Sequence, residues 1–209
     1  FASEHFDAVL DLWYPGARGG KAAAELLFGE TSPSGKLPIT FYESLEQIPP
    51  FEDYSMEGRT YRYIKGKAQY PFGFGLTYGN SQVCSAFIED SDINRPQQED
   101  LWISVEAENL NEAETDDILQ VYIRDLDSPW ETPHPHLAAF CRVHFSGAEK
   151  KTVRLPLAHR CFTVVDSDGR RFHDGSHFEI FAGFSQPDAR SIELTGKRPV
   201  LLEYTVPKN

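Results

Sequence analysis

Apolar side chains recur at every second position along several short segments in the second half of the chain. Two runs show this most clearly: Leu101, Ile103, Val105 and Ala107, then Leu119, Val121 and Ile123. Successive side chains of a β-strand point to opposite faces, so a period of two predicts strands that bury one face. Shorter runs predict further strands over residues 153–157, 178–182 and 200–206.

Turn-rich segments separate these predicted strands, at residues 109–112, 166–169 and 185–188. Several short strands with turns between them are typical of an immunoglobulin- or fibronectin-type sandwich. The Cys–Trp–Cys arrangement of antibody domains is absent from the sequence. Aromatic residues are plentiful enough for a large core, with 15 Phe, 9 Tyr and 3 Trp. We therefore predict that residues 80–209 form an all-β sandwich.

The first part of the chain has a different pattern, in which a strand precedes a helix. The apolar run at residues 8–10 leads to Trp-Tyr-Pro-Gly at residues 13–16, which predicts a buried strand entering a turn. Residues 21–28 are rich in Ala and Leu and precede Gly29, which predicts a helix with a glycine cap. A buried strand needs other elements on both faces. We therefore interpret residues 1–79 as the end of an α/β domain whose remainder lies upstream.

The glycines between that strand and helix do not form a nucleotide site. A phosphate loop requires Gly, four residues, then Gly-Lys-Ser/Thr, whereas Pro15 and Ala22 stand at its first and last positions. No G-x-G-x-x-G pattern is present either. The sequence therefore predicts a tight turn with close helix packing there, and no cofactor.

Residues 32–78 are dense in glycine, proline and aromatic side chains. Flexible linkers are rich in Gly and Ser and poor in aromatic residues, and helices tolerate few prolines. We therefore predict an ordered, non-helical connection between the two parts of the chain.

Four motifs occur in order within the first 78 residues: Trp-Tyr-Pro-Gly-Ala-Arg-Gly-Gly at 13–20, Phe-Gly-Glu-Thr-Ser-Pro-Ser-Gly-Lys-Leu-Pro at 28–38, Gly-Arg-Thr-Tyr-Arg-Tyr at 58–63, and Pro-Phe-Gly-Phe-Gly-Leu-Thr-Tyr at 71–78. Together they resemble the C-terminal part of glycoside hydrolase family 3, of the β-glucosidase and β-xylosidase type. The segments 120–125, 137–140 and 182–185 agree. Thr77 and Gly79 depart slightly from the family's usual Gly-Leu-Ser-Tyr-Thr. The resemblance implies the end of an α/β-sandwich domain with a connector at 1–79, and a fibronectin-III-like domain at 80–209.

The resemblance also implies a function for the whole enzyme. Family members are retaining, exo-acting β-glycosidases that hydrolyse terminal β-linked glucosyl or xylosyl residues without a cofactor. The family's catalytic aspartate and its usual acid/base glutamate both lie upstream of these motifs, so we expect no catalytic residue in this chain. Glu52, Asp53 and Glu57 lie beside the third motif, but no family motif places an acid/base there, and we interpret them as solvated loop carboxylates.

Arg59, Tyr61 and Arg62 are the polar candidates for contact with substrate. An arginine can clamp hydroxyl groups or a carboxylate, and a tyrosine ring can stack on the face of a sugar. The alternative, which we favour, is that these side chains fasten the connector to neighbouring domains by ion pairs and aromatic packing.

Metal binding is not predicted. His134 and His136 form a pair between prolines, and His159 and Cys161 are two residues apart, but two ligands are too few for a zinc site. The three cysteines, Cys84, Cys141 and Cys161, form no CxxC pair. We interpret them as buried reduced thiols, which favours a reducing, cytoplasmic compartment.

A net charge of −12 and the lack of Lys/Arg clusters argue against nucleic acid. No stretch approaches the roughly 20 apolar residues that span a bilayer, so a membrane partner is not predicted either. The expected partners are the upstream catalytic domains and a carbohydrate substrate, with a homo-oligomer left open. The alternative functions are a structural or oligomerisation domain and a carbohydrate-binding module, for which Trp102 and Trp130 are the aromatic candidates.

Overall fold

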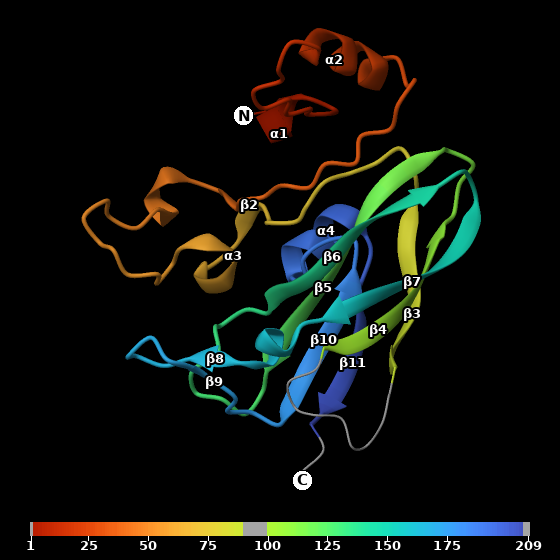
Figure 1. Ribbon diagram of the computed structural model, residues 1–209. Coiled ribbons are helices and arrows are strands. Elements are labelled where there is room, and N and C mark those ends of the chain that lie inside the picture. The colour runs from red at the N-terminus through yellow and green to blue at the C-terminus, as the bar shows by residue number, and fades with distance from the viewer. Residues whose placement is uncertain (1, 90–99, 207–209) are drawn as a thin grey trace.

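The computed structural model describes residues 2–89 and 100–206. Most regular structure is β, in two main antiparallel sheets (Figure 1). One sheet has the order β3 (Ser81–Glu89), β4 (Leu101–Asn109), β7 (Glu149–Leu157). The other has the order β11 (Val200–Thr205), β10 (His177–Gly183), β5 (Thr115–Asp125), β6 (His136–Phe145). The five strands predicted from apolar alternation are all confirmed.

The core lies between these two sheets. Ile103 and Val105 of β4, Val121 and Ile123 of β5 and Ile180 of β10 are fully buried in one hydrophobic cluster. Burying an aliphatic side chain of this size contributes about 1.5–3 kcal/mol. The faces that the sequence assigned to the interior are therefore the faces that drive the two sheets together.

The outer face of β5 is buried as well, which the alternation does not predict. Gln120 and Tyr122 point away from the core yet are only 2% and 1% exposed. Gln120 Nε2 donates to the carbonyl oxygen of Gly73, and the Tyr122 ring meets the edge of Tyr61. The connector thus covers this face of the sheet.

Short elements complete the sandwich end of the chain. They are the 3₁₀ helix η2 (His159–Phe162), the pair β8 (Val164–Val165) and β9 (Arg171–Phe172), and the helix α4 (Ala189–Thr195). The predicted turn at 185–188 leads into α4, whose N-cap Asp188 accepts a hydrogen bond from the Ser191 backbone at 2.9 Å. Gly196 ends the helix at φ 69°, the left-handed conformation that glycine adopts without strain.

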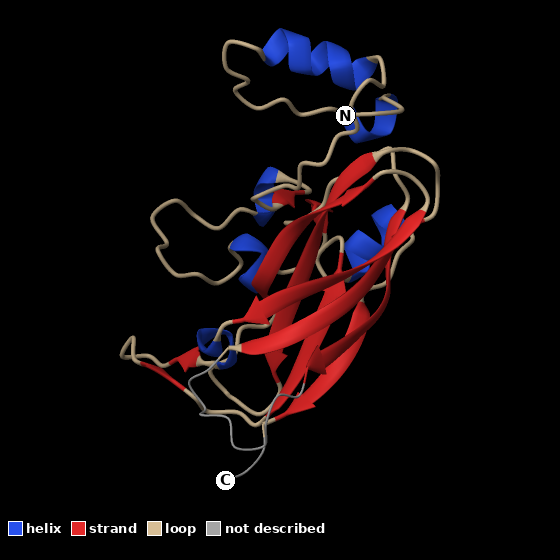
Figure 2. Ribbon diagram, turned by 45° about the vertical axis from the view of Figure 1, so that its right-hand side comes forward, coloured by secondary structure: helices blue, strands red, loops and turns tan. Residues whose placement is uncertain are grey.

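The N-terminal part contains α1 (Ala2–His5) and α2 (Gly19–Leu27), beyond one end of the sandwich (Figures 1 and 2). The predicted helix is confirmed, and Gly29 after it has φ 74°. The predicted buried strand at residues 8–10 is wrong, because Val9 and Leu10 are 56% and 43% exposed and the segment is irregular. A strand is stabilised by hydrogen bonds to a neighbour, and none of the described strands pairs with this segment.

The connector is ordered, as predicted, but it contains short helical turns. Its elements are β1 (Phe41–Tyr42), the 3₁₀ helix η1 (Leu45–Gln47), α3 (Thr60–Tyr63) and β2 (Ala68–Tyr70), with β1 paired to β2. The Ser44 and Gln47 side chains form a reciprocal capping box around η1. Such local side-chain bonds satisfy backbone groups that a long helix would otherwise satisfy. Among the described helices of the chain, none is long and apolar enough to cross a membrane.

Candidate functional site

Arg59 directs its guanidinium to backbone carbonyl groups of the loop that precedes it. Nε donates to the Ser55 carbonyl oxygen at 3.1 Å, and Nη2 donates to the Pro50 carbonyl oxygen at 2.9 Å and to that of Asp53. Charge-assisted hydrogen bonds to backbone oxygens are among the stronger ones in proteins. Arg59 therefore fixes the conformation of residues 50–55.

Tyr61 lies between the connector and the sandwich. Its ring stacks on Phe72 with centroids 4.3 Å apart, and its hydroxyl oxygen accepts a hydrogen bond from the Leu137 backbone N–H at 3.0 Å. Its edge contact with Tyr122 has a centroid distance of 6.2 Å. One face of the ring is covered by Phe72, so this tyrosine joins two parts of the chain.

Arg62 follows Tyr61 within α3, after Thr60, which has φ 55°. Its Nε is buried and has no hydrogen-bond partner within the described residues. Arg59 and Arg62 thus differ, because Arg59 bonds to its own loop whereas Arg62 retains an unpaired donor. The structure does not gather the three candidates around one point: of the three, Tyr61 alone lines the cavity described below.

The three loop carboxylates considered as acids do not form a catalytic pair. Glu52, Asp53 and Glu57 are all exposed. Hydrogen bonds from the Ser55 backbone and hydroxyl lower the pKa of Asp53, and Glu57 forms an ion pair with Lys65. A general acid in a glycosidase needs a raised pKa, which is the opposite of what the environment of Asp53 provides.

The histidines serve as hydrogen-bonding groups between segments. His134 Nε2 lies 3.0 Å from the Ile64 carbonyl oxygen in the connector, and His136 Nε2 lies 3.1 Å from that of Cys161. His159 pairs with His173, with Nε2 atoms 2.6 Å apart, rather than with Cys161. Within residues 2–89 and 100–206, no group of three His, Cys, Asp or Glu side chains is arranged to hold a metal ion.

The cysteines and tryptophans fit the sequence interpretation only in part. All three cysteines are free thiols, but of the three only Cys161 is buried, so the prediction of burial is wrong for the half-buried Cys84 and Cys141. Partial burial still raises the pKa of the Cys141 thiol, and burial raises that of Cys161. The reducing compartment stays a prediction.

The Arg154 guanidinium covers the Trp102 ring at 4.0 Å from its centroid, whereas Trp130 is 44% exposed. One face of the Trp102 ring is therefore already occupied by Arg154.

A buried ion pair fastens the connector to the sandwich. Lys36 Nζ lies 2.7 Å from Asp117 Oδ1 on β5 and donates to the Gly75 carbonyl oxygen at 2.6 Å. The two side chains are 9% and 6% exposed. Lys197 is close by, where burial lowers the pKa of its ammonium group, an effect that Asp117 opposes and Lys36 reinforces. No local pattern predicts this pair, because its members are 81 positions apart, at 36 and 117.

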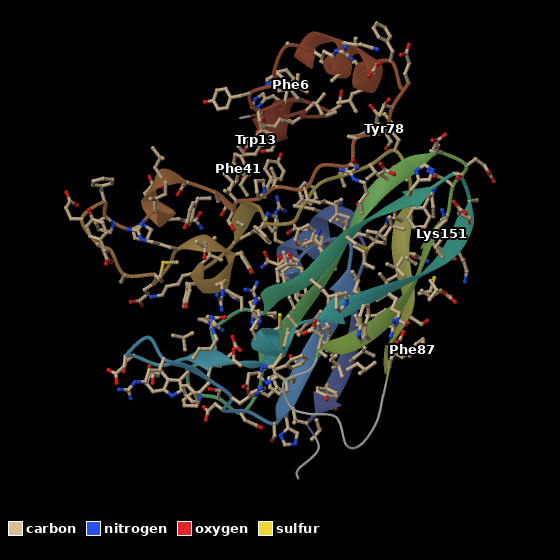
Figure 3. The ribbon with its side chains drawn as sticks, in the orientation of Figure 1. Phe6, Trp13, Phe41, Tyr78, Phe87 and Lys151 are labelled. Atoms are coloured by element: carbon tan, nitrogen blue, oxygen red, sulfur yellow. The ribbon has the colours of Figure 1, made fainter. Side chains whose placement is uncertain are left out.

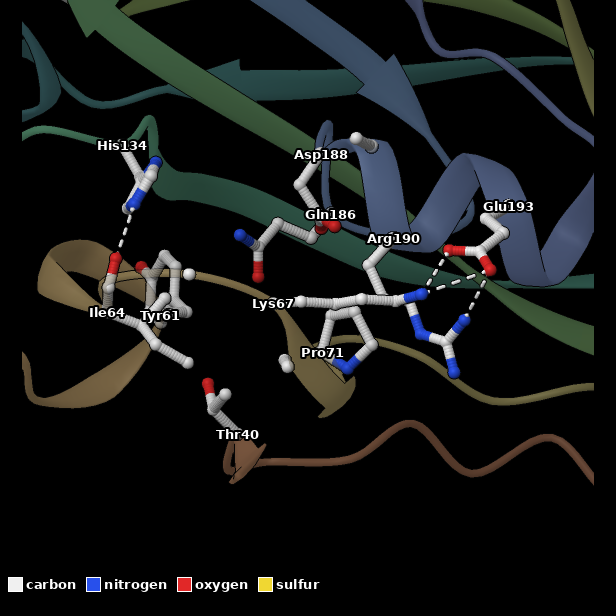
Figure 4. A pocket seen from close by; sticks show the side chains of 13 residues that line it. Thr40, Tyr61, Ile64, Lys67, Pro71, His134, Gln186, Asp188, Arg190 and Glu193 are labelled. Atoms are coloured by element: carbon white, nitrogen blue, oxygen red, sulfur yellow. Dashed lines mark hydrogen bonds and ion pairs between the residues drawn. The ribbon is translucent and has the colours of Figure 1, made fainter. Parts of the chain in front are cut away.

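A cavity of about 390 Å³ lies between the connector and α4 (Figure 4). Its lining includes Thr40, Tyr61, Ile64, Lys67, Pro71, His134, Gln186, Asp188, Arg190 and Glu193. At one side, Glu193 forms ion pairs with Lys67 at 3.0 Å and with Arg190 at 2.9 Å. Sequence reasoning singled out Tyr61 and His134 but missed the rest, because they come together only through the docking of the connector.

Comparison with known proteins identifies the family to which this architecture belongs. Residues 1–78 match the glycosyl hydrolase family 3 C-terminal domain, and residues 117–186 match the fibronectin type III-like domain. The chain belongs to glycoside hydrolase family 3. This finding confirms the resemblance that the four motifs carry, and both family 3 domains occur in the expected order.

Relatives within family 3 cover most of the chain. A xylan 1,4-β-xylosidase of Xylanibacter ruminicola is 34% identical over 92% of this chain and 22% of its own length. A periplasmic β-glucosidase of Salmonella typhimurium is 30% identical over 85% of this chain and 24% of its own length. The chain thus spans about a quarter of the length of these curated family 3 proteins.

Solved family 3 structures have the same fold. A β-glucosidase from Erythrobacter marinus superimposes with a TM-score of 0.78 and 28% identity, over 98% of this chain and 26% of its own. A β-glucosidase from Listeria innocua, solved in complex with isofagomine, gives a TM-score of 0.74 and 25% identity over 97% of this chain and 28% of its own.

Proposed function

We propose that this chain works as the C-terminal portion of a retaining, exo-acting β-glycosidase that hydrolyses terminal β-linked glucosyl or xylosyl residues. The observation that carries the proposal is the match of both domains, in order, to relatives named β-xylosidase and β-glucosidase over 85–92% of the chain. The partners in this proposal are the catalytic domains upstream and a carbohydrate substrate, and neither a cofactor nor a metal is needed.

The proposed role of the chain itself is to buttress those domains. We divide it into residues 1–79, the C-terminal part of an α/β-sandwich domain with its connector, and residues 80–209, a fibronectin-III-like domain. Phe6, Trp13, Tyr14 and Phe28 are between 50% and 99% exposed in the first part, and Figure 3 shows Phe6 and Trp13 beyond the end of the sandwich. Exposed apolar patches of this kind mark surfaces that another structure covers.

Arg59, Tyr61 and Arg62 take different roles in this proposal. Arg59 and Tyr61 hold the connector in place, as their contacts with residues 50–55, Phe72 and Leu137 support. Arg62, whose buried Nε has no hydrogen-bond partner within the described residues, is the member of the set that we assign to a substrate hydroxyl or a catalytic carboxylate.

The test is an assay of this 209-residue chain beside the full-length protein that contains it, on nitrophenyl β-glucoside and β-xyloside. We expect hydrolysis with retention by the longer protein and none by the chain. Turnover by the chain alone would contradict the proposal. Glu52→Gln, Asp53→Asn and Glu57→Gln variants would then identify the carboxylate responsible. Inactivity of the full-length protein on a panel of β-glycosides would refute the glycosidase assignment itself.

A further inference from the structure

The cavity between the connector and α4 carries two polar atoms that nothing in the described chain satisfies. Gln186 Oε1 and Thr40 Oγ1 are both buried without a hydrogen-bond partner within residues 2–89 and 100–206, and both residues line the cavity. Gln186 is only 5% exposed, and its side chain extends into the space between α4 and the connector (Figure 4). Leaving a buried polar group unpaired is costly, so such atoms are normally bonded to protein, water or a ligand.

The charged side chains around the cavity already have hydrogen-bond partners within the chain. Glu193 accepts from Lys67 and Arg190, and these bonds lower the pKa of its carboxyl group. Asp188 is occupied as the cap of α4, where it accepts from the Ser191 backbone and hydroxyl. The buried lining atoms without a hydrogen-bond partner within the described residues are therefore neutral ones, an amide oxygen of Gln186 and a hydroxyl oxygen of Thr40.

The rest of the wall is apolar or aromatic, with Ile64, Pro71 and Ala189 among its members. A volume of about 390 Å³ falls in the range of roughly 300–1,000 Å³ that is typical of small-molecule sites. Sites of this type combine an apolar lining with a few polar groups that fix the orientation of the ligand. Ligand hydroxyl groups can form hydrogen bonds with both unpaired atoms, Gln186 Oε1 and Thr40 Oγ1, because a hydroxyl can donate and accept.

From this arrangement we propose that the cavity is a binding site for a neutral, polyhydroxylated molecule the size of a monosaccharide. Its hydroxyl groups bond to Gln186 Oε1 and Thr40 Oγ1, and its carbon skeleton lies against Ile64 and Pro71. The ligand touches both the connector and the segment that leads into α4, so its binding tightens the joint between them. This inference does not depend on the glycosidase activity proposed above.

The experiment is ligand-observed NMR and calorimetry on the 209-residue chain with D-xylose, D-glucose and glycerol, and with D-glucuronate as a charged probe. We expect saturable binding of at least one neutral sugar with a Kd on the order of 1 mM, the affinity expected for so small a ligand. Thr40→Val and Gln186→Leu should each weaken it at least five-fold. Thr152→Val, the same change at an exposed position of β7, is the matched control and should leave it unchanged.

A second variant guards against misfolding as an explanation. Ala189→Phe fills part of the cavity without removing either polar atom, and it should abolish binding while circular dichroism and the melting curve stay close to those of the parent chain. The proposal is overturned if no neutral sugar binds saturably at about ten times the expected Kd. It is equally overturned if a crystal grown with the sugar shows only water bound to Gln186 and Thr40.

Discussion

Replacing Asp117 with alanine removes the anion that neutralises Lys36 at the junction of the connector and β5. The two groups lie 2.7 Å apart and are at most 9% exposed, so the lysine left behind cannot regain its hydration. Lys197 is half-buried close by and also loses the favourable field of Asp117. The substitution therefore leaves the buried Lys36 ammonium group without a compensating charge and with a second ammonium group near it.

Removing one partner of a buried ion pair costs about 3–5 kcal/mol, because an uncompensated charge remains in the interior. We expect Asp117→Ala to lower the free energy of unfolding by about 4 kcal/mol. Urea unfolding followed by circular dichroism measures this directly, and with a slope of about 3 kcal/mol/M the midpoint falls by about 1.3 M.

The control is Glu57→Ala, which removes the acid of an ion pair whose side chains are 73% and 71% exposed. Exposed pairs contribute about 0–1 kcal/mol, so this variant should unfold close to the parent midpoint. A double variant, Lys36→Met with Asp117→Leu, should be more stable than Asp117→Ala by about 1 kcal/mol or more, since apolar pairs replace buried ion pairs well. If Asp117→Ala costs no more than Glu57→Ala, the pair is effectively solvated and the reasoning is refuted.

Two further predictions concern the hydrophobic core and the loss of stability at acid pH. Ile123→Ala, at a fully buried position, should lower the free energy of unfolding by about 2–5 kcal/mol in the same urea assay. Phe87→Ala, at a residue that is 57% exposed, should lower it far less. Equal losses of stability would contradict the assignment of the core. Hydrogen bonds from the Ser176 backbone, His177 and the Ser176 hydroxyl hold the pKa of Asp127 well below its ordinary value of 3.8. A depressed carboxyl pKa gives stability that is present above pH 3.8 and lost as the pH falls through the folded-state pKa. The parent chain should therefore exceed Asp127→Asn in stability at pH 7, and the gap should narrow below pH 3.8; a gap independent of pH would contradict this.

The sequence predicts those parts of the fold in which one face of a strand is buried and the other is not. β4 shows this, because Leu101, Ile103 and Val105 all lie in the core at the expected period of two. β3 has no such pattern, since its register with β4 shifts between Val83 and Ser85 and most of its residues are half-buried. A bulge and an outer strand position erase the alternation on which the prediction depends.

Other features that the sequence does not predict depend on contacts between segments that are far apart in the chain. Nothing local to β5 indicates that Gln120 and Tyr122 are covered, because Gly73 and Tyr61 approach from far along the chain. The same is true of Gln186 and Thr40, whose importance depends on the cavity that docking creates. By contrast, α4 could have been found, because Asp188 and Gly196 bracket it with recognisable helix-start and helix-stop residues.

The connector's bonds to the sandwich have a mechanical consequence. Lys36 to Asp117, Gly73 to Gln120, Tyr61 to Leu137 and Ile64 to His134 are separate attachments along one segment. A hinge needs a few residues that rotate freely, whereas bending here would break several of these bonds together. These attachments therefore couple residues 36–75 to the fibronectin-like sheets, so that a rotation of the sheets carries the connector with them.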